Sequence, residues 1–244
     1  MEVVLGDLPR RNASKFGNKE AIIGEDGRWT FRELNSRINC RANALLAAGM
    51  QKGDHVATLF MNSAAVLEVI FAVLKIGAVV VPLNFRLSAG EMSYLIRHAQ
   101  ANWLVTSPEF APLIERLHAD PPELKKCFCA GGVAPSGVLD LDHLMQAAGS
   151  EEPPVSVRGE DRAFIMYTAG TTGRPKGVVT VHNNWIWSSI NTLMGGQIET
   201  SPKHLTVYPV FYAAAFLTVF SVYFVGVTLV LLRKFDPQAV LEKV

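Results

Sequence analysis

The chain has 244 residues, of which 49% are hydrophobic, and a formal net charge of +1 at pH 7. This composition excludes a disordered chain and suffices for one large α/β domain or two small ones. The basic residues are scattered in isolated pairs and form no continuous basic surface in the sequence pattern. The charge pattern therefore gives no support to nucleic-acid binding.

The cysteines favour a reducing compartment. They number three, at positions 40, 127 and 129, with no C-x-x-C spacing, and the first residues lack the basic and apolar regions of a signal peptide. We therefore expect free thiols and a cytoplasmic location. Cys127 and Cys129 would share one face of a strand, where buried thiols are expected rather than metal ligands, because no histidine pair stands near.

The first hundred residues alternate between strand and helix patterns. Thr30 with Glu33, and Ser88 with Glu91, form capping boxes that begin two helices. The expected helices are 8–16, 31–48, 63–76 and 89–99, and the expected strands are 21–23, 28–30, 55–60, 78–81 and 103–106. The helix at 63–76 is so apolar that it must be mostly buried. This order predicts an α/β fold with a doubly wound, largely parallel sheet flanked by helices.

The middle of the chain is less regular. Helices near 108–118 and 139–148 and a strand at 125–129 are expected, separated by proline and glycine clusters typical of surface connections. A strand at 163–166 follows. Further on, Asn183 is expected to cap a helix at 185–194, and His182 is expected to be solvated or bonded in the core, with a ligand role as the alternative.

Residues 167–177 form the most informative stretch, Tyr-Thr-Ala-Gly-Thr-Thr-Gly-Arg-Pro-Lys-Gly, between two apolar runs. Its three glycines let the backbone approach a ligand closely, and its threonine hydroxyls can donate hydrogen bonds. Lys176 adds a positive charge, and successive backbone amides in such a turn form an anion-binding concavity. The loop therefore predicts a polyphosphate cradle.

This loop has two other interpretations. A Walker A loop requires lysine followed by serine or threonine, whereas Pro175 takes the position expected for the second glycine and Gly177 follows Lys176. The run at 178–181 predicts a strand, but a Walker loop opens a helix. A P-loop NTPase is thus disfavoured. A glycine-rich hairpin without a ligand is the second alternative, although plain turns rarely combine these residues.

The loop resembles the signature Tyr-Thr-Ser-Gly-Thr-Thr-Gly-x-Pro-Lys-Gly of the adenylate-forming superfamily, which includes acyl-CoA synthetases, luciferases and peptide-synthetase adenylation domains. The departure is Ala169 in place of serine, which would weaken phosphate binding by about tenfold unless flanking hydroxyls compensate. The resemblance implies that ATP phosphates are bound by Thr168, Ala169, Gly170, Thr171, Thr172, Gly173 and Lys176. It implies catalytic roles for Lys176, Thr171 and Thr172, and places Thr172 at Mg²⁺.

Residues 209–215, Pro-Val-Phe-Tyr-Ala-Ala-Ala, resemble the second motif of that superfamily, Pro-x-Phe-His-x-x-Gly. Tyr212 takes the position of the histidine, which in the family lies beside the carboxylate of the acid substrate. A phenol carries no positive charge near neutral pH, so a gate based on imidazole chemistry is in question. An aromatic core residue is the equally weighted alternative.

The run 205–232 contains no charged residue and is flanked by Lys203 and Arg233, as in a membrane span. Pro209 and Gly226 nevertheless divide it into a strand at 205–208, a helix and a strand at 227–232. We expect no transmembrane segment, and peripheral contact with lipid stays open.

The resemblance spans the whole chain but only the front half of a family member. It implies that residues 1–244 are an N-terminal AMP-binding domain of the acyl-CoA synthetase-like fold, without the adenine- and ribose-binding segments and the mobile C-terminal domain. The stretches at 82–88, in which Asn84 and Arg86 are interpreted as structural, and at 235–237 favour the acyl-CoA ligases.

The implied reaction activates a fatty or aromatic carboxylic acid with ATP and Mg²⁺ as an acyl-adenylate and transfers the acyl group to coenzyme A. The chain alone is expected to be inactive, and a homodimer is a further option. The alternatives are a non-catalytic interaction module of the same fold and another adenylate-forming enzyme, luciferase-like or specific for amino acids.

Overall fold

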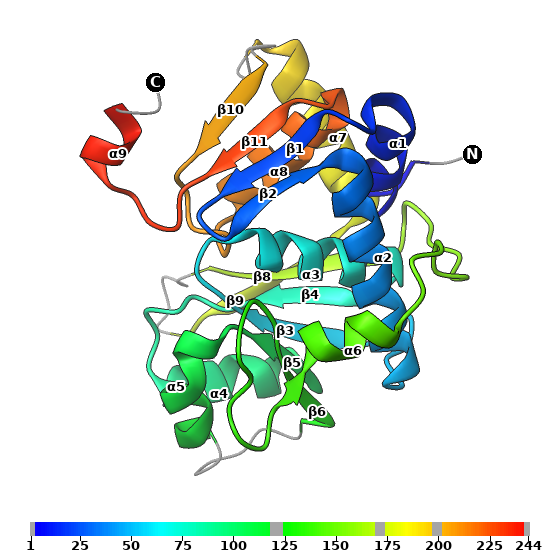
Figure 1. Ribbon diagram of the computed structural model, residues 1–244. Coiled ribbons are helices and arrows are strands. Elements are labelled where there is room, and N and C mark those ends of the chain that lie inside the picture. Colours follow the sequence, from blue (N-terminus) through cyan, green and yellow to red (C-terminus); the bar gives the residue numbers. More distant parts are fainter. Residues whose placement is uncertain (1–2, 118–123, 169–173, 197–201, 242–244) are drawn as a thin grey trace.

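The computed structural model describes residues 3–117, 124–168, 174–196 and 202–241. Two β-sheets lie one above the other, with helices between them and outside them (Figure 1). The helices are α1 (Asp7–Phe16), α2 (Phe31–Ala47), α3 (Ala64–Lys75), α4 (Ala89–His98), α5 (Ala111–Leu117), α6 (Leu141–Ala147), α7 (His182–Met194), α8 (Ala213–Val225) and α9 (Pro237–Leu241), with a short 3₁₀ helix at Pro108–Phe110.

The larger sheet has seven strands in the order β7-β6-β5-β3-β4-β8-β9. These strands are β3 (His55–Leu59), β4 (Val79–Pro82), β5 (Trp103–Thr106), β6 (Lys126–Cys129), β7 (Leu139–Asp140), β8 (Arg162–Thr168) and β9 (Lys176–Val181). All neighbours are parallel except β8 and β9, which form an antiparallel hairpin. The predicted doubly wound, largely parallel sheet is confirmed.

The smaller sheet joins the two ends of the chain in the order β10-β11-β1-β2. Its strands are β1 (Glu20–Gly24), β2 (Gly27–Thr30), β10 (Lys203–Thr206) and β11 (Thr228–Leu231). The predicted hairpin of β1 and β2 is present, and β1 pairs in parallel with β11, with Ile22 opposite Leu229. The sequence patterns identified these strands but not that they form a second sheet.

The main core lies between the two sheets, where α3 and α2 pack (Figure 1). Every residue of α3 is buried, as its composition predicts. Alternation along the strands divides the side chains: Val56 and Val80 face this core, whereas Ala57 and Val79 face α4 and α5 on the outer side. Both predicted capping boxes are present, at the N-termini of α2 and α4.

Three predicted boundaries are wrong. The helix predicted from Leu139 begins at Leu141, and Leu139 belongs to β7. Asp140 caps α6, because its Oδ1 accepts a hydrogen bond from the amide of His143 at 2.9 Å. Asn183 does not cap α7: the helix already begins at His182, and the amide of Val181 donates to Oδ1 of Asn184. Strand β10 lies two residues earlier than predicted, in parallel register with β11.

The uncharged run is divided as expected into β10, α8 and β11, and Gly226 ends α8 in the left-handed conformation with φ 74°. Across the described ranges, helices long and apolar enough to cross a membrane are absent.

Candidate active site

The larger sheet reverses its winding at β3. The chain passes from β3 through α3 to β4 on one side, and from β4 through α4 to β5 on the other side of β3. Helices α3 and α4 therefore cover opposite faces. In open α/β sheets, ligands bind outside the carboxyl ends of the strands beside such a reversal. Strand β4 ends there at Pro82, and its parallel neighbour β8 ends at Thr168.

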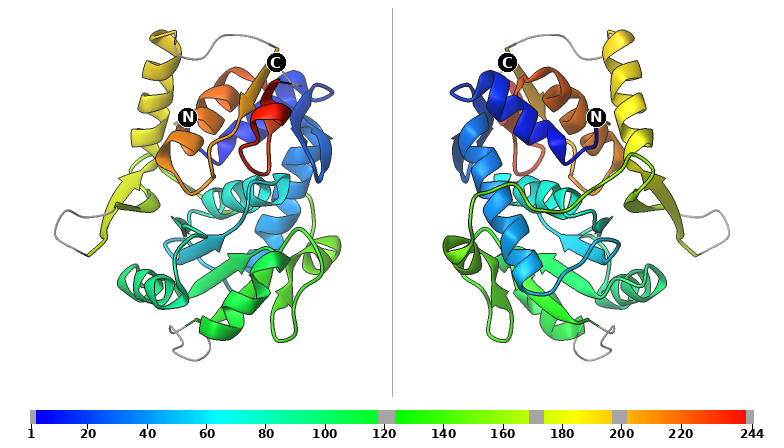
Figure 2. Two further views of the ribbon diagram at one scale, coloured as in Figure 1. Left: turned by 90° about the vertical axis from the view of Figure 1, so that its left-hand side faces the viewer. Right: turned by 90° about the vertical axis from the view of Figure 1, so that its right-hand side faces the viewer.

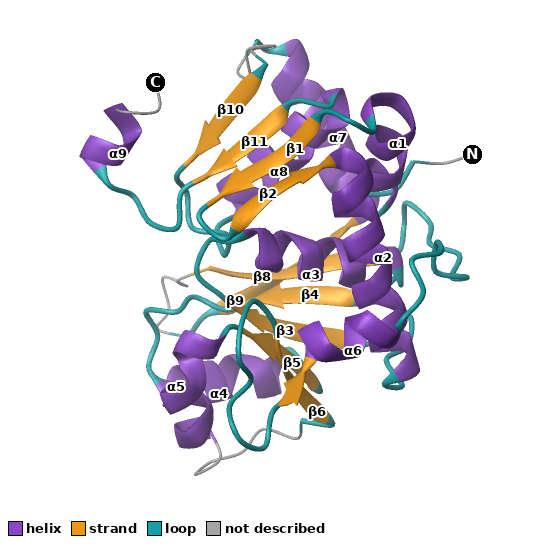
Figure 3. Ribbon diagram, in the orientation of Figure 1, coloured by secondary structure: helices purple, strands orange, loops and turns teal. Residues whose placement is uncertain are grey.

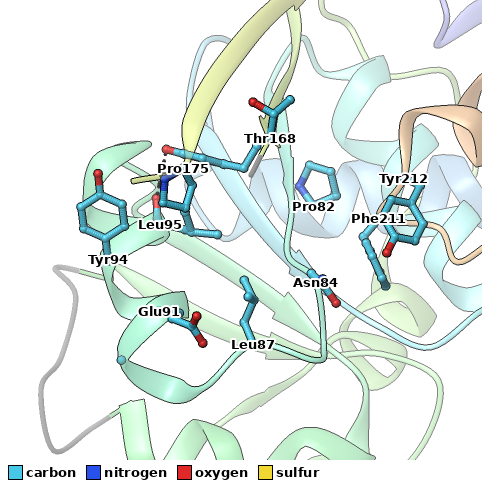
Figure 4. Close-up of a pocket in the computed structure, with 12 residues that line it drawn as sticks. Pro82, Asn84, Leu87, Glu91, Tyr94, Leu95, Thr168, Pro175, Phe211 and Tyr212 are labelled. Atoms are coloured by element: carbon cyan, nitrogen blue, oxygen red, sulfur yellow. Dashed lines mark hydrogen bonds between the residues drawn. The ribbon is translucent and has the colours of Figure 1, made fainter. Parts of the chain in front are cut away.

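A pocket of about 540 Å³ opens at these carboxyl ends (Figure 4). Its walls come from the end of β4, from α4, from the β8–β9 hairpin and from the segment before α8. The lining residues are Pro82, Asn84, Leu87, Gly90, Glu91, Tyr94, Leu95, Tyr167, Thr168, Pro175, Phe211 and Tyr212. Most of this surface is apolar or aromatic, with a few polar groups.

The two ends of the loop that the sequence predicts to bind phosphate meet beside this pocket. Thr168 is the last residue of β8 and lies directly opposite Lys176, the first residue of β9. Both residues are exposed, so a threonine hydroxyl and a lysine ammonium stand side by side at the end of the hairpin. Such a pair suits an anion. The predicted site residues Ala169, Gly170, Thr171, Thr172 and Gly173 lie outside the described residues.

Tyr167 fastens the hairpin to α4. Its hydroxyl lies 2.7 Å from Nδ1 of His98 and 3.4 Å from the carbonyl oxygen of Leu95, to which it donates. Burial, and then the nearby Tyr94, raise the pKa of Tyr167 to about 12, so its phenol stays neutral. Sequence reasoning did not assign this role, because His98 is far from the loop in the chain.

Tyr212 lies on the other side of the pocket (Figure 4). It immediately precedes α8, and its ring centroid is 4.3 Å from that of Phe211, which in turn is 5.1 Å from that of Phe85. The side chain is 44% exposed, so Tyr212 is not a buried core residue. A helix N-terminus favours negative charge, and here it adjoins an aromatic wall.

Two polar residues of the pocket lining accept hydrogen bonds from nearby backbone amides. Glu91 accepts from the amide and the hydroxyl of Ser88 at 2.8 and 2.7 Å. The Ser88 side chain, and then its amide, hold the pKa of Glu91 below its usual value. Asn84 accepts from the amide of Arg86 at 3.0 Å, which agrees with its structural interpretation, although it also lines the pocket.

His182 lies elsewhere. It is fully buried, and its Nδ1 accepts from the backbone amide of Leu5 at 3.3 Å. The expectation of a core-bonded histidine is confirmed, and the ring is not part of the pocket lining.

Within the part of the chain that the structure describes, no cluster of three His, Cys, Asp or Glu residues could hold a metal ion. Cys127 and Cys129 are free thiols, and burial raises the pKa of Cys127 to about 12 and that of Cys129 to about 11. Both are therefore protonated, unreactive thiols at neutral pH.

Comparison with known proteins gives one consistent result. The pattern of the AMP-binding enzyme family matches residues 9–244. The feruloyl-CoA synthase of Amycolatopsis sp is 36% identical over 241 residues, covering 98% of this chain and 46% of that protein. The long-chain-fatty-acid–CoA ligase FadD13 of Mycobacterium tuberculosis is 35% identical, covering 97% and 46%.

Solved structures agree with these matches. The inhibitor-bound N-terminal domain of FACL13 from Mycobacterium tuberculosis superposes with a TM-score of 0.90 at 31% identity, covering 99% of this chain and 60% of that one. The anthranilate CoA ligase AuaEII, in complex with anthranoyl-AMP, superposes with a TM-score of 0.85 at 26% identity, covering 94% and 45%. The chain spans about half the length of the curated relatives it matches.

Proposed function

Because the chain belongs to the AMP-binding enzyme family, we propose that it is the N-terminal AMP-binding domain of an ATP-dependent carboxylate–CoA ligase. One observation carries this proposal: Thr168 of the phosphate loop and Tyr212 of the second motif line the same pocket. The two motifs were identified independently in the sequence. Their meeting at the carboxyl ends of β4 and β8 gives the polyphosphate and the acid a common site.

The lining supports an apolar acid. Leu87, Leu95 and Phe211 offer surface to a hydrocarbon or aromatic group. Tyr212, together with the first turn of α8, offers a hydrogen bond and a favourable potential to the carboxylate. The names of the relatives, which include a feruloyl-CoA synthase and a long-chain-fatty-acid–CoA ligase, fit an aromatic or an aliphatic acid equally.

In the proposed first step, a carboxylate oxygen attacks the α-phosphorus of ATP, and the bond from that phosphorus to the bridging oxygen of pyrophosphate breaks. Negative charge then grows on the leaving pyrophosphate. Lys176 and the hydroxyl of Thr168 stabilise this charge from fixed positions at the end of the hairpin. We propose that Thr172 would hold Mg²⁺, which would supply additional positive charge to the phosphates.

In the second step the thiol of coenzyme A attacks the acyl carbon and releases AMP. The chain covers 46% of each of these relatives. We therefore propose that the 244-residue chain alone does not complete catalysis. A cytoplasmic location stays a prediction from the cysteine pattern.

The test is acid-dependent exchange of labelled pyrophosphate into ATP, measured with a panel of fatty and aromatic acids. It is run on the 244-residue chain and on the longest protein that its gene encodes. Exchange by the long protein alone is expected, and the most active acid identifies the substrate. Absence of exchange in both proteins would contradict the proposal and favour a non-catalytic interaction module, the alternative that Ala169 suggests.

A further inference from the structure

Asn62 lies in the segment between β3 and α3 and is only 4% exposed. Its side chain bonds three backbone groups that come 146 to 170 positions later in the chain. Nδ2 donates to the carbonyl oxygens of Tyr208 and Leu232, both at 3.0 Å. Oδ1 accepts from the amide of Val210 at 2.9 Å. The three bonds use both amide protons and the oxygen, so the partners fix the orientation of the amide group.

The three partners lie at the two ends of one segment. Two of them flank Pro209, the first residue of the second motif, and the third, Leu232, directly follows β11. The segment between them comprises the second motif, α8 and β11, and it lies in the upper part of the molecule with the smaller sheet (Figure 2). A single side chain from the larger sheet therefore holds both ends of this segment.

Asn62 belongs to a firmly held part of the fold. It precedes Ser63, whose hydroxyl caps α3 by accepting from the amide of Val66 at 3.2 Å. Asp26, between β1 and β2, accepts from the amide of Ala64 at 2.9 Å, and α3 begins just below that turn (Figure 3). Strand β3 is paired on both sides, with β4 and β5. The position of Asn62 therefore does not depend on the second motif.

The start of α8 lacks such local support. Tyr212 is its N-cap residue, and no side chain caps the helix there. The amide of Tyr212 donates to the carbonyl oxygen of Pro209 at 3.0 Å, which closes a turn. Val210 lies within this turn, and Asn62 binds its amide. The turn also carries Phe211, and both aromatic side chains line the pocket (Figure 4).

We propose that Asn62 is a positioning residue for the acid substrate: by holding the turn at 209–212, it places Phe211 and Tyr212 against the acid. This rests on the proposed function. The lining of the pocket does not include Asn62, so the residue acts through the turn rather than by contact. The phosphate side of the site has a separate support, because Tyr167 fastens the hairpin to α4. Loss of the Asn62 bonds should therefore affect the acid and not ATP.

The main variant is Asn62→Asp, which keeps the size and the acceptor for the Val210 amide but places a carboxylate oxygen against two carbonyl oxygens. The matched control is Asn12→Asp. Asn12 is 3% exposed, and its Nδ2 donates to the carbonyl oxygen of Tyr223 at 2.6 Å, near the other end of α8. Asn62→Ser introduces no charge and serves as a second variant if Asn62→Asp does not fold.

The experiment measures acid-dependent pyrophosphate exchange by the longest protein that the gene encodes, with the acid and ATP titrated separately. Amide hydrogen exchange of the same proteins measures the protection of the Val210 amide. We expect the KM for the acid to rise about tenfold in the Asn62 variants, with the KM for ATP unchanged and faster exchange at Val210. Asn12→Asp should change none of these quantities.

A structural role alone would give a different result. Equal rises in the two KM values, the same rise for the acid in Asn12→Asp, unchanged protection of Val210, or failure of both Asn62 variants to fold would overturn the proposal. A wild-type protein that exchanges no pyrophosphate with any acid would instead count against the proposed function. The two failures are therefore distinguishable.

Discussion

Strands β4 and β9 lie two places apart in one sheet and have similar valine-rich sequences, yet their surroundings are opposite. Val79, Val80 and Val81 are buried, because α3 covers one face and α4 the other. Val178 and Val179 are about half exposed. Apolar composition therefore does not fix where a strand lies in a sheet. The helical crossovers on each side of β4 cover it, whereas a hairpin places β9 at the edge.

The two strands contribute differently to the site. Strand β4 contributes Pro82, a buried residue, to the pocket lining. Strand β9 brings Lys176 to the hairpin end, where the side chain is exposed. We infer that β4 contributes mainly to the stability of the fold and that β9 contributes mainly to function.

The largest loss of stability is expected at the ion pairs that Glu68 of α3 forms with two arginines. Glu68 is fully buried and pairs with Arg41 at 2.6 Å and with Arg37. Glu68→Gln leaves the buried guanidinium of Arg41 with Asp142, at 2.7 Å, as its remaining carboxylate partner, so we expect a cost of about 3 kcal/mol in the free energy of unfolding. Urea unfolding measures it. The control is Glu109→Gln, which breaks a surface pair with Arg233 and should cost less than about 1 kcal/mol.

The second prediction compares the two strands directly. Val80→Ala in β4 removes two buried methyl groups and leaves a cavity, so we expect a loss of roughly 2 kcal/mol. Val179→Ala in β9 should change the free energy of unfolding by less than about 0.5 kcal/mol. Thermal unfolding of both variants gives the two values. Equal losses would show that β9 is as important for stability as β4.

A smaller effect is expected at the N-terminus of α2. The hydroxyl of Thr30 accepts from the amide of Glu33 at 3.3 Å. Thr30→Ala removes this cap and should cost about 1 kcal/mol. Thr30→Ser keeps the hydroxyl and should restore most of the stability. Failure of serine to do so would mean that the methyl group, not the hydrogen bond, matters.

The smallest effect is a dependence on pH. The backbone amide and then the hydroxyl of Thr30 hold the pKa of Glu33 below its ordinary value. The unfolded chain therefore binds the proton more readily, and the contribution of Glu33 is present above the ordinary pKa and lost as pH falls through the lowered one. Unfolding measured between about pH 3 and pH 7 should show the gap between wild type and Glu33→Gln closing at the acid end. A constant gap would contradict the assignment.

The sequence predicts most of this fold because its signals are local. The capping boxes at Thr30 and Ser88 and the unbroken apolar run in α3 need no knowledge of distant residues. The pairing of β1 with β11 was not predicted, since strand pairing between the two ends of a chain leaves no local pattern. The predicted helix at 139–148 began two residues too early, because Asp140 both ends strand β7 and caps α6.

The residues of the candidate site were likewise predicted only in part. The motifs led to Thr168 and Tyr212, and both line the pocket. Tyr94, Leu95 and the contact of His98 with Tyr167 were not assigned, because they are brought to the site by the packing of α4 against the hairpin. Pocket walls formed by helix packing carry no motif of their own, whereas loops that bind phosphate do.

We propose that the end of the β8–β9 hairpin stabilises the phosphates during adenylation. The most direct measurement is the rate of acid-dependent pyrophosphate exchange by Lys176→Ala in the longest protein that the gene encodes. Lys203→Ala, another exposed lysine at the start of a strand, is the matched control. We predict a fall of about 10²-fold for Lys176→Ala and no change for the control. Unchanged exchange by Lys176→Ala would contradict the account.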